Sequence, residues 1–229
     1  MILTPVLLCA GLWAAPASTA AVKTAFLLHG ILNAPVSLRR IEAALERRGF
    51  TVVNLDYPSR SRTVEEHAAW LDQQVRARGR GELYFVGHSL GSIVIRYYLA
   101  RYRPEAARRF VMIAPPNHGS LMADKVHKTG LYRLVWGDHS GAELRASNEH
   151  FWADLPPPPI EFGIIAGGRG GRRGFNPLIP GDNDGTLAVA ETRLPEARDF
   201  VLLPYQHTGI VLRKATAERV VRFLETGRF

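Results

Sequence analysis

Short apolar runs alternate with longer amphipathic stretches along this 229-residue chain, and this alternation restricts the fold more than any other feature. Each run is too short for a helix, and several are rich in Val, Ile, Phe or Tyr, as strands covered on both faces should be. We therefore expect six strands. They are Ala25–His29, Thr51–Leu55, Leu83–Val86, Phe110–Ala114, Ile160–Ala166 and Phe200–Leu203.

The stretches between these runs carry apolar residues at helical spacing. The expected helices are Val36–Arg48, Val64–Arg78, Gly91–Tyr102 and Ala215–Leu224. Strands that alternate with helices are typical of a parallel sheet with crossover helices. We predict an α/β protein in which residues 22–229 form a single domain, with a mostly parallel central sheet of about six strands flanked by helices.

Two segments interrupt the alternation. Residues 115–159 form a long stretch with Pro, Gly, His and Trp, and residues 167–181 contain the run GGRGGRRG. Both fall between predicted strands, so we read them as insertions within the domain. The first contains Trp136 and Trp152 among other apolar residues. It either packs onto the domain or forms a lid over an apolar groove.

The N-terminal residues have features of an export signal. Residues 2–15 are nearly uncharged and apolar, and residues 17–21 supply the small side chains that a signal peptidase needs. We expect residues 1–21 to be a cleaved signal peptide or an N-terminal anchor, which makes the protein exported, whether periplasmic, secreted or membrane-associated. The alternative is a retained segment packed on a cytoplasmic protein.

The net charge of +8 is carried by 25 Arg and 4 Lys. The arginines occur singly or in pairs along the predicted helices, and the chain has no nucleic-acid-binding motif or aromatic-interleaved basic stripe. We therefore expect no nucleic-acid partner. Arg169, Arg172 and Arg173 in the second insertion could bind an anionic group, and the competing interpretation is a solvated loop.

The residues Gly87-His88-Ser89-Leu90-Gly91 follow one predicted strand and open the next helix. This is the G-x-S-x-G elbow in its strand-to-helix setting, where the serine sits strained at the tip of a sharp turn. The flanking Gly87 and Gly91 are needed because a Cβ at either position would collide with a neighbouring strand or helix. The turn predicts an exposed Ser89 hydroxyl beside the N-terminus of a helix.

Three companion segments indicate nucleophilic catalysis. His29-Gly30-Ile31 follows the first strand, where a backbone donor to an oxyanion is expected, and we assign the two donors to the N–H groups of Ile31 and Leu90. Asp184 and His207 follow the fifth and sixth strands. A serine hydroxyl needs a base such as histidine, and a carboxylate orients that base.

One of these roles has other candidates. Asp182 lies two residues from Asp184, and Asp56 ends the second strand, so either could supply the carboxylate in place of Asp184. We favour Asp184 because Gly185 permits the tight turn that aims its carboxylate. His29 and His88 neighbour the elbow and the oxyanion segment, and we expect them to be buried and hydrogen-bonded supports.

These motifs together resemble the α/β-hydrolase superfamily, and within it the compact bacterial lipase and esterase-like proteins. The shared features are HG after the first strand, GHSLG at the elbow, PPNHGS after the next strand, NDGTL and a late HTG, and the resemblance extends over residues 25–229. It implies an α/β-hydrolase fold that lacks the first two strands of larger members. Some larger secreted lipases hold calcium through an aspartate where this chain has Gly209, so no metal is expected.

The resemblance and the residues imply a serine hydrolase that cleaves carboxylic esters through an acyl-enzyme on Ser89, without a cofactor. The partner is then a small-molecule ester or lipid, and association with a membrane surface stays open. One alternative is an acyltransferase or amidase-like enzyme that uses the same three residues. Another is a lipid-binding module without catalytic activity.

Overall fold

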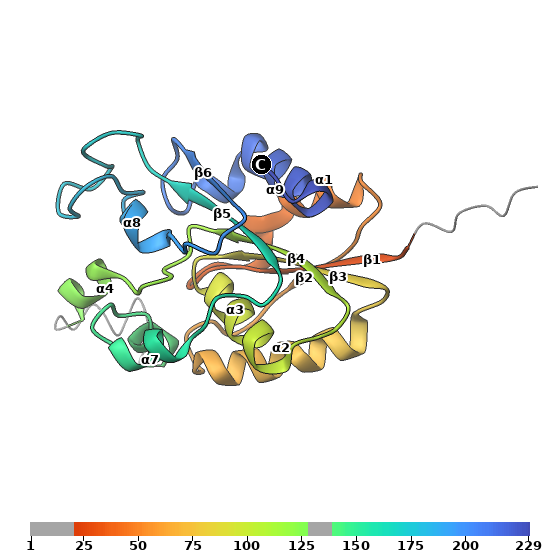
Figure 1. Ribbon diagram of the computed structural model, residues 1–229. Helices are drawn as coiled ribbons and strands as arrows, with labels where there is room; N and C mark the ends of the chain where they lie inside the picture. The colour runs from red at the N-terminus through yellow and green to blue at the C-terminus, as the bar shows by residue number, and fades with distance from the viewer. Residues whose placement is uncertain (1–20, 128–138) are drawn as a thin grey trace, which may run out of the picture.

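The computed structural model describes residues 21–127 and 139–229, and all six predicted strands form there (Figure 1). They are β1 (Lys23–Leu28), β2 (Thr51–Leu55), β3 (Glu82–His88), β4 (Ala107–Ile113), β5 (Glu161–Gly167) and β6 (Asp199–Leu203). They pair side by side in one sheet, and all five pairings are parallel. The predicted fold class is confirmed, with a sheet that is parallel throughout.

The strand order β2-β1-β3-β4-β5-β6 changes direction between β1 and β3. The chain runs outward from β1 to β2, then returns to β3 and continues outward to β6. The connection that follows β1 therefore turns toward β2, and the connection that follows β3 turns the opposite way, toward β4. In open parallel sheets, ligands bind at such a switch point, outside the carboxyl ends of the strands.

Helices cover both faces of the sheet. Figure 1 shows α1 (Arg39–Glu46) and α9 (Lys214–Thr226) on one face, and α2 (Val64–Arg78) and α3 (Leu90–Tyr102) on the other. Shorter helical segments lie in the connections: η1 (Pro35–Leu38), α4 (Leu121–Val126), α6 (Ser140–Glu143), α7 (Glu149–Asp154), α8 (Val189–Thr192) and η2 (Ile210–Leu212). The four predicted helices are all present, and the first, predicted for Val36–Arg48, begins with the 3-10 turn η1 and becomes α-helical at Arg39.

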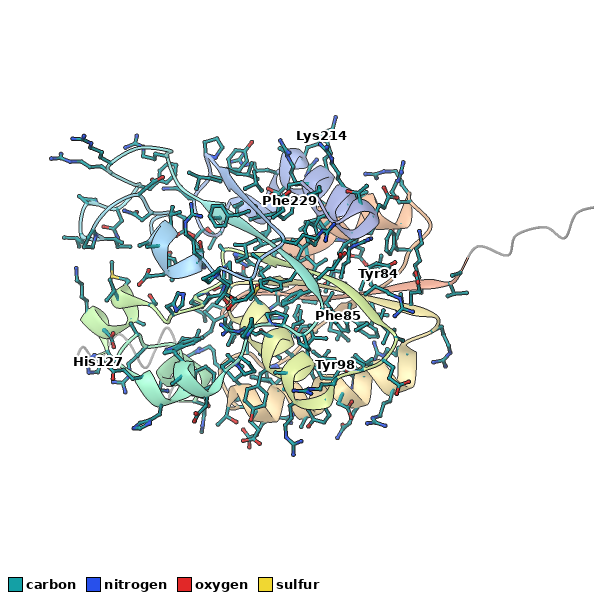
Figure 2. All side chains as sticks on the ribbon, viewed as in Figure 1. Tyr84, Phe85, Tyr98, His127, Lys214 and Phe229 are labelled. Atoms are coloured by element: carbon teal, nitrogen blue, oxygen red, sulfur yellow. The ribbon has the colours of Figure 1, made fainter. Side chains whose placement is uncertain are left out.

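The strand period of two residues divides the core into two apolar clusters. On β3, Phe85 points toward α3 and packs against Tyr98, with ring centroids 5.8 Å apart. Its neighbour Tyr84 points to the opposite face and meets Phe50 edge-on at 5.2 Å. In Figure 2 the labelled Phe85 and Tyr98 lie on the side of α3, and the labelled Phe229 lies on the opposite side, with α9.

The described parts of the 115–159 insertion lie against the domain. Leu155 is buried, and Phe151 and Trp152 pack on the cluster beneath α2 and α3. The stretch 128–138, which includes Trp136, is outside the described residues, so the lid hypothesis is not tested over its middle. Residues 1–20, the predicted export segment, are also outside the described residues. Among the helices that are described, none has the length and apolar character to cross a membrane.

Gly163 on β5 provides a test of how tightly the sheet packs on α9. A Cβ at this glycine would come within 2.4 Å of the buried Phe223 ring. Overpacking a core costs about 1–3 kcal/mol, so we expect Gly163→Ala to lower the free energy of unfolding by about that amount, measured in urea. Gly171→Ala is the control, because a Cβ there meets nothing within 4 Å. Equal stability of both variants would contradict the packing described here.

Candidate active site

The turn from β3 into α3 places Ser89 in a strained conformation. Ser89 has φ 51° and ψ −122°, an unfavourable region for a residue with a side chain. Its backbone N–H donates to the Ile113 carbonyl at 2.9 Å, which ties the turn to β4. A Cβ at Gly87 would lie 2.5 Å from the Ser92 backbone, and one at Gly91 would lie 2.4 Å from the Leu28 carbonyl oxygen. Only glycine fits at positions 87 and 91, two residues before and two residues after this serine.

Ser89, His207 and Asp184 lie in one chain of hydrogen bonds. His207 follows β6, and its Nε2 is 3.0 Å from Ser89 Oγ. Its Nδ1 is 2.7 Å from Asp184 Oδ2, and its backbone N–H donates to the Asp184 carbonyl at 2.9 Å. The carboxylate can only accept, so Nδ1 carries the proton and the Nε2 lone pair is free to accept from the serine hydroxyl. All three residues are buried.

Two backbone donors hold the Asp184 carboxylate. Its Oδ1 accepts from the N–H groups of Thr186 at 2.9 Å and Leu187 at 2.7 Å, in a turn that Gly185 makes with φ 98°. Burial alone would raise the pKa of Asp184. His207 and the two N–H donors outweigh burial, so the pKa lies below its usual value. Asp184 therefore stays ionised beside the imidazole.

The two alternative carboxylates lie elsewhere. Asp182 accepts the backbone N–H groups of Arg169 at 2.7 Å and Gly170 at 2.8 Å, and so closes the base of the GGRGGRRG loop. The Asp56 side chain is 81% exposed and lies 3.4 Å from His29 Nε2. Of the three candidates that the sequence left open, the structure brings Asp184 into contact with His207.

The His29-Gly30-Ile31 segment lies directly beside the elbow, because Leu28 on β1 pairs with Gly87 on β3. A Cβ at Gly30 would come within 3.1 Å of Ser89 Cβ, so the segment approaches the serine closely. Within residues 21–127 and 139–229, neither Ile31 nor Leu90 donates its N–H to another group of the protein. Leu90 is the first residue of α3, where the positive end of the helix dipole also lies.

A layer of buried rings supports this segment, and sequence reasoning missed two of its members. The Tyr57 hydroxyl donates to the His29 carbonyl at 2.8 Å, and the two rings are tilted by 30° with their centroids 4.6 Å apart. His67 on α2 meets the Tyr57 ring edge-on at 4.8 Å. Tyr57 lies just beyond β2 in Asp56-Tyr57-Pro58, and its distance in sequence from His29 hid the contact.

His88 holds the backbone of His207. Its Nε2 lies 3.0 Å from the His207 carbonyl oxygen, which can only accept, so the proton resides on Nε2. Burial lowers the pKa of His88 to about 3, so the ring is neutral at physiological pH. The expectation that His29 and His88 are buried agrees with their exposed fractions of 0%.

A cavity of about 210 Å³ opens beside Ser89 and His207. Its apolar lining comes from Ile31, Leu32, Pro116, Leu144 and Leu187. The 115–159 insertion thus supplies part of its wall. Among the described residues, no cluster of three or more His, Cys, Asp or Glu side chains could hold a metal ion. The residues beside the cavity include a hydroxyl, an imidazole and backbone N–H groups, which can act as a nucleophile, a base and hydrogen-bond donors.

Comparison with known families agrees with this architecture. A family model for the alpha/beta hydrolase fold matches residues 26–140, half of the chain, and the protein belongs to that family. No curated protein matches the sequence.

Several solved structures share the fold. The mature lipase BlEst2 of Bacillus licheniformis has a TM-score of 0.70 at 19% identity, covering 90% of this chain and 92% of the lipase. Phospholipase PlaB of Legionella pneumophila has a TM-score of 0.66 at 17% identity, covering 90% and 60%. A metagenomic carboxyl esterase has a TM-score of 0.64 at 17% identity, covering 84% and 66%. At these identities the likeness establishes the fold.

The buried His67 predicts a loss of stability in acid. Burial lowers its pKa to about 4, and neither ring nitrogen has a hydrogen-bond partner among the residues that the structure describes. The unfolded chain has a histidine pKa of about 6.5, so it binds the proton first as the pH falls. The free energy of unfolding should be highest above that pH and decrease as the pH drops toward 4.

His67→Phe should flatten this dependence, because phenylalanine binds no proton in either state. The measurement is urea unfolding at a series of pH values. His150→Phe is the control, since His150 is exposed on α7. An unchanged pH dependence in His67→Phe would show that His67 does not carry the effect.

Proposed function

We propose that this protein is a serine hydrolase that cleaves carboxylic esters through an acyl-enzyme on Ser89. One observation carries the proposal: the buried hydrogen-bond chain from Ser89 Oγ through His207 to Asp184, at the wall of an apolar cavity. A serine hydroxyl is a weak nucleophile by itself, and a neutral imidazole at 3.0 Å can take its proton as it reacts.

In the acylation step, each group of the site has one role. Ser89 Oγ bonds to the ester carbonyl carbon while its proton passes to His207 Nε2. The carbonyl oxygen becomes an anion, and the N–H groups of Ile31 and Leu90 stabilise it. Asp184 stabilises the imidazolium that forms. When the tetrahedral intermediate collapses, the alcohol leaves with the proton from His207 Nε2.

Deacylation repeats these steps with water. His207 Nε2 takes a proton from water as the oxygen attacks the acyl carbon, and Ser89 Oγ leaves with that proton, which releases the acid. An alcohol or amine in place of water would make the same protein an acyltransferase. Product analysis separates the two outcomes, because only hydrolysis releases the free acid.

The substrate class rests on the cavity. Its apolar side chains suit an acyl group, and its position next to Ser89 Oγ leaves a reacting carbonyl within reach. Lipase, phospholipase and carboxyl esterase are the activities named for structures with the same fold. They favour an ester or lipid as the substrate here.

We expect Ser89→Ala to abolish ester cleavage. The hydroxyl forms the covalent bond, and in a triad its loss costs on the order of 10⁶ in turnover. The measurement is the hydrolysis of p-nitrophenyl butyrate by wild type and variant. A fluorophosphonate probe should label wild type and leave the variant unlabelled. Equal rates for both proteins would end the proposal, and absence of both labelling and turnover in wild type would favour a non-catalytic lipid-binding module.

The carboxylate can be tested by a matched pair of variants. Asp184→Asn removes the acceptor that orients His207, and the loss in turnover should be about 10⁴-fold. Asp182→Asn makes the same chemical change two residues away, where the side chain accepts the N–H groups of Arg169 and Gly170. We expect it to change turnover by only a few-fold. A larger loss in Asp182→Asn than in Asp184→Asn would reverse the assignment.

A further inference from the structure

We infer that Leu144 limits the length of the acyl chain and that the substrates are esters of short-chain acids; this inference rests on the proposed function. The cavity beside Ser89 has a volume of about 210 Å³. An apolar cavity of about 150 Å³ binds benzene, with its six carbon atoms, so this one holds about eight non-hydrogen atoms. The ester group itself needs three of them. An acyl chain longer than about six carbons would exceed the remaining space.

Leu144 lines this cavity from the 115–159 insertion. Its side chain is 5% exposed, lines the cavity, and belongs to the apolar cluster beneath α2 and α3. The wall is therefore backed by packed core and not by solvent. Close-packed interiors yield little to an added group, because each displaced side chain must leave its preferred rotamer.

Leu144 and its two neighbours in the chain each make a hydrogen bond to another segment. The side-chain Oε2 of the preceding Glu143 accepts the N–H of Val64, the first residue of α2, at 2.7 Å. The Leu144 carbonyl accepts from Ser120 N–H at 2.9 Å. The following Arg145 carbonyl accepts from the Trp152 indole at 2.8 Å. Three consecutive residues thus bond to three separate segments, which prevents Leu144 from retreating when a longer chain enters.

The insertion that carries Leu144 is also tied to the helix that begins at the elbow. Arg96 on α3 donates to the carbonyls of Asn117 at 3.1 Å and Pro156 at 3.0 Å, near the two ends of the insertion. The same helix starts at Leu90, next to Ser89. Helix α3 therefore sets the position of both the cavity wall and the nucleophile.

The other apolar side chains of the lining are less suited to this role. Ile31 and Leu187 belong to the segments that provide an oxyanion donor and hold the Asp184 carboxylate. Leu32 is 54% exposed at the rim, so solvent and not packed core lies behind its side chain. Leu144 is the buried leucine of the lining that lies outside the proposed catalytic residues and their immediate neighbours.

The test measures kcat/KM for the p-nitrophenyl esters of acetate, butyrate, octanoate and dodecanoate. Wild type should prefer butyrate to octanoate by about tenfold or more, because misfit in an apolar pocket costs about that factor per methylene. Leu144→Ala removes three carbon atoms from the wall. We expect it to raise the octanoate-to-butyrate ratio by about tenfold or more.

Leu155→Ala is the matched control. Leu155 is a buried leucine of the same insertion and the same apolar cluster, with 4% exposure, and the cavity lining does not include it. The two variants should lose comparable stability, yet only Leu144→Ala should change chain-length preference. If Leu144→Ala does not fold, Leu144→Val removes a single carbon and should change the ratio in the same direction by a smaller factor.

The outcomes separate this inference from the proposed function. Ester cleavage with equal preference for butyrate and octanoate in wild type would overturn the inference alone. An unchanged ratio in the leucine 144 variants, or the same rise in Leu155→Ala, would overturn it as well. If wild type cleaves none of the esters and a fluorophosphonate does not label it, the proposed function fails and the inference fails with it.

Discussion

The close contact between the end of β1 and the turn after β3 is the constraint on which the rest of the site depends. Leu28 and Gly87 are paired across these strands, and Gly91 packs directly on the Leu28 carbonyl. This contact brings the segment that carries Ile31 beside the turn that carries Ser89 and Leu90. A slip of one residue between the strands would turn every side chain to the opposite face and separate the two segments.

Burial of the polar residues around Ser89 then determines their protonation states. His88 is neutral because burial lowers its pKa to about 3, and its single proton is committed to the His207 carbonyl. Asp184 remains ionised because His207 and the two N–H donors outweigh the same effect. The carboxylate can only accept, so its contact with Nδ1 holds the imidazole of His207 in one tautomer.

The sequence predicted those parts of the fold and site that depend on local chemistry. The elbow is recognisable because a strained serine needs glycine on both sides, and Gly87 and Gly91 are four residues apart. All six strands were predicted because their apolar runs are short and uninterrupted. The contact of Tyr57 with His29 and the position of Leu144 were not predictable, because they depend on which distant segments the folded chain brings together. No periodicity in the sequence reports such a contact.

Arg96 illustrates why the insertion and the elbow helix depend on each other. Its side chain is buried, and burial lowers the pKa of Arg96 to about 10, which leaves it charged at neutral pH. The charge is solvated by the carbonyls of Asn117, Leu155 and Pro156 instead of water. Removing any of these acceptors would leave a buried cation short of partners, which is costly. Moving either described end of the insertion would therefore cost free energy, because Arg96 would lose an acceptor. This cost also keeps the cavity wall in place.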